Sequence, residues 1–166
     1  MANKVTLEIS TAAPEGDFAI ICLIGTNAKI IPHLEKEQAA ELIAAMGAAQ
    51  FTGKSGSTLT LYLAQKTYLL VGIGDGVEAG RNAEDLGGHM FNALDKSVNK
   101  RGFMPEHGLN ETVLGDILFG VRLAGYHFEE YFTQSESVDK TVNLVIVSDK
   151  LDDGHPVMVD RNALLD

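Results

Sequence analysis

The sequence predicts a layered α/β domain, in which helices cover a β-sheet. Two short runs, residues 18–24 and 67–71, are rich in apolar residues and do not alternate regularly with polar ones. Such runs are typical of strands that are buried on both faces of a sheet. Segments with apolar residues at helical spacing lie between the predicted strands. The strand, glycine loop and helix within residues 66–100 therefore form the predicted centre of the domain.

The N-terminal third predicts two strands and a helix. Val5, Leu7 and Ile9 alternate with polar residues, which indicates a half-exposed strand. The apolar run at 18–24 is the second strand and ends at a glycine. Helical spacing of apolar residues, with acidic residues in the first turn, predicts a helix over about 34–48.

The middle of the chain predicts a hairpin followed by a helix. Residues 58–64 alternate between leucines on one face and Thr or Tyr on the other, and a short link joins them to the strand at 67–71. A helix is expected to open after Gly80. Asn82 is its predicted N-cap, because its side-chain oxygen suits the free amides of a first turn.

The last part predicts a short strand at 103–104, a long helix and a final strand at 142–147. Asn110 is the predicted cap of the helix, which is expected to end near Phe132. Three glycines interrupt this helix, and each costs about 1 kcal/mol relative to alanine. Close packing against another backbone is the expected reason for them. They are Gly115, Gly120 and Gly125.

Composition excludes several classes of protein. The net charge of −10 argues against binding to nucleic acid or to an anionic membrane, because phosphate contacts need clustered Lys and Arg. Cys22 is the single cysteine, so no internal disulfide is possible and a buried thiol is expected. No signal core or membrane-spanning run occurs, so a cytoplasmic location is the prediction.

The glycine loop is the motif with a ligand-binding character. Gly74, Asp75 and Gly76 follow a buried strand and precede a helix, where backbone N–H groups can hold a phosphate. The loop fits G-x-G-x-x-G poorly and does not match G-x-x-x-x-G-K-[ST]. The alternative is a tight strand-to-helix connection that needs glycine for its backbone dihedrals.

No catalytic or metal-binding residue can be assigned from the sequence. The five histidines lie far apart in the chain, and none belongs to an H-E-x-x-H motif. The serines and Cys22 lack a partner pattern such as G-x-S-x-G.

Two segments, a strand end and a long helix, carry a resemblance to a known family. The strand ends in Val71-Gly72-Ile73-Gly74. The helix begins at Val113-Leu114-Gly115-Asp116 and closes with a tyrosine-x-phenylalanine-x-x-tyrosine pattern at Tyr126, Phe128 and Tyr131. Together with the order of elements they resemble the N-terminal domain of the leucyl (cytosol) aminopeptidases. The resemblance covers nearly the whole chain. It implies a three-layer α/β/α fold, with a macro-domain-like mixed sheet flanked by helices.

The resemblance also implies where the chemistry of such an enzyme lies. Family members are typically hexamers that remove N-terminal residues from peptides with two divalent metals, commonly zinc or manganese. Lysine, aspartate and glutamate side chains of a C-terminal domain hold these metals around an N-T-D-A-E-G-R-L motif, which is absent from this chain. Residues 161–166 have the pattern of a helix start, so we expect one accessory domain over 1–166 and a catalytic domain after it.

The function predicted from the sequence is therefore that of a non-catalytic domain with a structural or assembly role. Its expected partners are its own catalytic domain and further copies of the parent chain. One alternative is a stand-alone macro-like module that binds ADP-ribose or a nucleotide through Gly74, Asp75 and Gly76. A small hydrolase in its own right is a third possibility.

Overall fold

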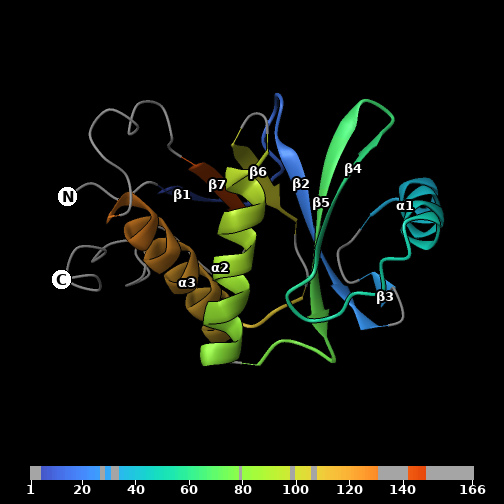
Figure 1. Cartoon of the computed structure of the whole chain (residues 1–166). Coiled ribbons are helices and arrows are strands. Elements are labelled where there is room, and N and C mark those ends of the chain that lie inside the picture. The colour runs from blue at the N-terminus through green and yellow to red at the C-terminus, as the bar shows by residue number, and fades with distance from the viewer. Residues whose placement is uncertain are drawn as a thin grey trace.

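A computed structural model shows a sheet with helices on both faces, which confirms the predicted α/β class (Figure 1). It describes residues 5–26, 29–30, 34–78, 80–97, 100–105, 108–130 and 142–148. The side chains of 29–30 and 126–130 are outside this description. So are Tyr131, the predicted helix end near Phe132, the predicted polar segment at 134–140 and the predicted helix start at 161–166.

The described residues form seven strands and three helices. The strands are β1 (Val5–Ser10), β2 (Ala19–Gly25), β3 (Lys29–Ile30), β4 (Thr58–Leu63), β5 (Lys66–Gly74), β6 (Arg101–Met104) and β7 (Val142–Val147). The helices are α1 (Lys36–Ala48), α2 (Arg81–Asp95) and α3 (Glu111–Glu130).

The sheet is mixed, with the order β1-β7-β6-β2-β5-β4. Neighbours along this order are parallel, except that β4 runs antiparallel to β5. The short β3 pairs antiparallel with the end of β2. Strand β4 stands at one edge and, in the part of the chain that the structure describes, pairs with β5 alone. The predicted hairpin is confirmed, and Ala64 and Gln65 make its turn with φ of 50° and 65°.

Two apolar clusters fill the space on either side of the sheet. Helices α2 and α3 pack on one face, where Ile21, Leu23 and Val71 belong to the larger cluster. Helix α1 packs on the other face, where Cys22 and Leu70 belong to the smaller one. Successive residues of β2 and β5 thus point into different clusters, which explains the uninterrupted apolar runs at 19–24 in β2 and 68–71 in β5.

The structure confirms one predicted helix cap and corrects the other. The side-chain oxygen of Asn110 accepts a hydrogen bond from the Val113 amide at 2.9 Å, as expected of the α3 N-cap. The N-cap of α2 is Gly80, not Asn82. Asn82 lies inside the first turn, and its oxygen accepts a bond at 2.7 Å from the Glu78 amide, which precedes the helix. The prediction followed residue type, whereas Gly80 takes the cap position with φ of 95°.

Two further details differ from the prediction. Strand β5 continues through Gly72 to Gly74, so part of the predicted glycine loop is sheet. Strand β3 was not predicted, because two residues are too short to show a periodic pattern.

Helices α2 and α3 approach so closely that their backbones touch. A Cβ atom on Gly87 would lie 2.8 Å from the Val121 amide nitrogen and closer still to the carbonyl oxygen of Ile117. A Cβ atom on Gly120 would lie 2.7 Å from the carbonyl carbon of Glu84. The expectation that close packing explains a glycine in the long helix is therefore confirmed at Gly120.

We expect the Gly87→Ala variant to unfold at a lower urea concentration, with a loss of about 1–3 kcal/mol, because the added methyl forces the helices apart. The matched control is Gly88→Ala in the same helix, where a Cβ atom meets nothing within 4 Å. That change should instead raise the stability by about 0.5–1 kcal/mol through helix propensity. Equal stability of the two variants would contradict the proposed contact.

Candidate functional site

The glycine loop lies at the carboxyl ends of β2 and β5, in a hollow of about 820 Å³ that is open to solvent. From β2 the chain continues to α1 on one face of the sheet, and from β5 it continues to α2 on the other. In open α/β sheets, ligands bind where neighbouring connections diverge in this way. Gly74, Asp75 and Gly76 all line the hollow, together with Thr26 and Lys54.

The glycines at the end of β5 are required by the backbone around them. The segment from Gly53 to Ser57 runs across the strand end, and the Gly72 amide donates to the Ser57 carbonyl at 2.7 Å. A Cβ atom on Gly72 would overlap the carbonyl oxygen of Lys54. Gly74 and Gly76 have φ of 63° and 145°, backbone dihedrals that residues other than glycine rarely adopt. Gly74 and Gly76 thus have the backbone dihedrals that a tight connection built on glycine requires.

The amides that would hold a phosphate already have partners within the chain. The Gly74 amide donates to the Gly53 carbonyl at 2.9 Å, and the Gly76 amide donates to the Ile73 carbonyl at 3.2 Å. Phosphate binding by a loop depends on several free N–H groups that point at one spot. Of the three candidate residues, two would have to break internal hydrogen bonds before they could bind an anion.

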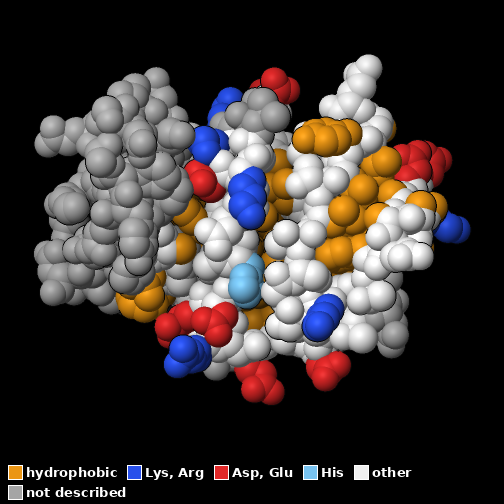
Figure 2. Space-filling view, viewed as in Figure 1, with side chains coloured by type: hydrophobic (Ala, Val, Ile, Leu, Met, Phe, Trp, Pro, Cys, Tyr) orange, Lys and Arg blue, Asp and Glu red, His pale blue; other side chains and the backbone are white. Residues whose placement is uncertain are grey.

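The start of α2 is also occupied by a group of the protein itself. The Gly80 amide donates to a carboxylate oxygen of Asp116 at 2.6 Å, and Asp116 lies on α3, 36 residues further along the chain. A carboxylate at a helix N-terminus uses the position that a bound anion would take. Asp75 and Glu78 add negative charge to the lining of the hollow, against the single base Lys54. Figure 2 shows acidic and basic side chains interspersed around this lower end of the molecule.

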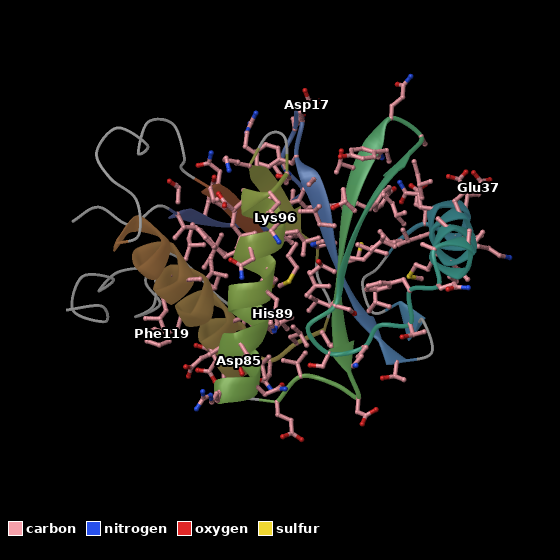
Figure 3. The ribbon with its side chains drawn as sticks, in the orientation of Figure 1. Asp17, Glu37, Asp85, His89, Lys96 and Phe119 are labelled. Carbon is pink, nitrogen blue, oxygen red and sulfur yellow. The ribbon has the colours of Figure 1, made fainter. Side chains whose placement is uncertain are left out.

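A smaller hollow of about 90 Å³ lies beside the first and contains polar groups of α2. Asp85 and His89 line it, together with Ser55 of the loop before β4. Figure 3 shows Asp85 near the start of α2 and His89 further along the same helix. Among the described residues, no group of three or more His, Cys, Asp or Glu side chains is placed to hold a metal ion.

Cys22, also considered from the sequence, lines neither hollow. Cys22 is fully buried in the sheet, and burial raises the pKa of its thiol to about 12. It is therefore protonated and unreactive at neutral pH, as expected of a small apolar residue.

In the described part of the chain, no helix is long and apolar enough to span a bilayer.

We expect Asp116→Ala to destabilise the fold by about 1–2 kcal/mol, because the Gly80 amide then loses its carboxylate partner. Asp116→Asn is the matched control, since its amide oxygen can still accept the bond, and it should lose less than half as much. Thermal and urea unfolding measure both. If alanine and asparagine were equally well tolerated, the contact would have no part in holding α2 on α3.

Comparison with known proteins identifies the family of this chain. The family model described as "Cytosol aminopeptidase family, N-terminal domain" matches residues 25–135. A mutant of tomato leucine aminopeptidase has a similar fold, with a TM-score of 0.64 and 24% sequence identity. The match covers 89% of this chain and 33% of the tomato chain, so the present chain corresponds to a third of that protein. No curated protein matches the sequence. Because the family model matches well over half of its length, the chain belongs to the cytosol aminopeptidase family, to whose N-terminal domain it corresponds.

Proposed function

We propose that this chain is the non-catalytic N-terminal domain of a leucyl-aminopeptidase-like metallopeptidase, with a structural or assembly role. The observation that supports this most directly is the match of residues 25–135 to the N-terminal domain of the family. The tomato structure supports it as well, since this chain corresponds to a third of that leucine aminopeptidase. In this proposal a separate catalytic domain removes N-terminal residues from peptides.

We place the two divalent metals, zinc or manganese, in that catalytic domain. Metal-assisted hydrolysis needs an ion held by several convergent ligands, which lowers the pKa of a bound water. The described residues of this chain bring no three such side chains together. A cytoplasmic parent enzyme that assembles as a hexamer completes the proposal.

The first test is a peptidase assay on the purified chain. With leucine p-nitroanilide and added manganese or zinc, we expect no turnover above the buffer rate, while a full-length enzyme of the family serves as the positive control. Metal-dependent turnover that follows the chain through gel filtration would show that the domain is catalytic and overturn the proposal.

The second arm of this test addresses the assembly role. Removal of the region equivalent to this chain from a full-length parent should reduce the number of subunits per assembly in analytical ultracentrifugation or lower the thermal midpoint. Retention of both would contradict a structural role, whatever the peptidase assay shows.

A second candidate function is the binding of ADP-ribose or a nucleotide by a macro-like module. The hollow of about 820 Å³ at the diverging strand ends favours it, because its size and position suit a small ligand. The hydrogen bonds already made by Gly74, Gly76 and Gly80 favour the accessory role instead.

Calorimetric titration with ADP-ribose distinguishes these two functions. The accessory role predicts no binding tighter than about 100 μM, equivalent to about −5.5 kcal/mol. Tighter binding, abolished by Asp75→Ala or by a bulky residue at Gly76, would establish the nucleotide-binding function.

A further inference from the structure

A third pocket lies at the opposite end of the sheet, where the parallel strands β2, β5 and β6 begin. It has a volume of about 120 Å³ and is lined by residues that precede β2, that open β5 and that open β6. Helix α2 ends at Asp95, and Ser97, two residues further on, also lines the pocket. Figure 3 shows Asp17, which lines this pocket, at the end of the molecule opposite Asp85.

An arginine stacked on an aromatic ring forms one wall of the pocket. The Arg101 guanidinium carbon lies 4.3 Å from the centre of the Phe18 ring. A guanidinium placed over an aromatic ring can still donate hydrogen bonds from the N–H groups on its edge. Because stacking already restricts the side chain, less conformational entropy is lost when those donors bind an acceptor.

The pocket has a positive charge balance in an acidic chain. Lys66 and Arg101 line it, against the single carboxylate of Asp17. Among the described side chains, Lys100 pairs with Asp95 at 2.7 Å, whereas neither Lys66 nor Arg101 is in ion-pair contact with a carboxylate. Among the described residues, two cations that pair with no carboxylate thus line one small cavity, although the chain as a whole has a net charge of −10.

We propose that this pocket binds a compact oxyanion, a small carboxylate or a phosphate. The planar edge of Arg101 can donate two parallel hydrogen bonds to such a group, and the Lys66 ammonium supplies a second charge. The Thr67 hydroxyl, also in the lining, is a further donor. A cavity of about 120 Å³ is too small for a nucleotide, since sites for drug-sized ligands have about 300–1,000 Å³.

The test is an NMR titration of the whole 166-residue chain with sodium phosphate and, separately, with sodium succinate. Sodium chloride at matched ionic strength is the control for general screening. We expect saturable shifts of the Lys66, Thr67 and Arg101 amides with at least one of the two anions, and the comparison of the anions distinguishes phosphate from carboxylate. Shifts that never saturate, or that equal those in chloride, would overturn the proposal.

Three variants locate the binding. Arg101→Gln should weaken it about tenfold, because the charged, two-pronged donor is lost. Asp17→Asn should tighten it about threefold by removing an opposing surface charge. The control is Lys36→Gln at the start of α1, on the other face of the sheet, which should leave the affinity unchanged.

Arg101→Gln and Asp17→Asn are expected to change the affinity in opposite directions, so the test still gives an answer if one of the two variants is unstable. If Arg101→Gln fails to fold, Lys66→Gln replaces it with the same expected direction, and Asp17→Asn must still bind more tightly. An equal loss in Lys36→Gln, or an unchanged affinity in both the Arg101 and Asp17 variants, would show that the anion does not bind in this pocket.

Discussion

Direct contact of backbone with backbone is the constraint on which the arrangement of this domain depends. At Gly87 and Gly120 the two helices of one layer meet without side chains between them. At Gly72 the loop before β4 lies on the end of the central strand in the same way. A protein interior is close-packed, so one methyl group at such a position must displace a whole element. These glycines therefore determine how near the two helices lie to each other and how near the loop lies to β5.

This constraint also determines which ends of the elements remain available for binding. Because α2 and α3 lie so close, Asp116 reaches the first turn of α2 and occupies its positive end. The loop that lies on β5 takes up the amides of Gly72 and Gly74. The sequence motif that most resembles a phosphate loop thus uses most of its backbone amides in hydrogen bonds within the fold. The opposite end of the sheet, which no motif marks, has Lys66 and Arg101 facing a cavity without a carboxylate in ion-pair contact among the described residues.

Much of the fold was predictable because short sequence patterns specify its strands and helices. The apolar runs at 18–24 and 67–71 predicted the central strands, and Asn110 was identified as a cap from its type and position. The corrected cap of α2 shows where local patterns fail. Gly80 takes the cap position, and its amide is satisfied by a carboxylate 36 residues away, which no short window of sequence contains. The pocket at Arg101 was missed for the same reason, since its residues come from three separate segments.

Strand β4 has a consequence for the handling of the isolated domain. It is an edge strand of the sequence TLTLYL, without charge or proline, and its Tyr62 is 69% exposed. Edges of this composition are templates on which a second chain can add its own strand. At neutral pH the surplus of acidic groups keeps copies apart by mutual repulsion. Near the isoelectric point of about 4.8 that repulsion disappears, so acidic buffers favour self-association and precipitation during purification.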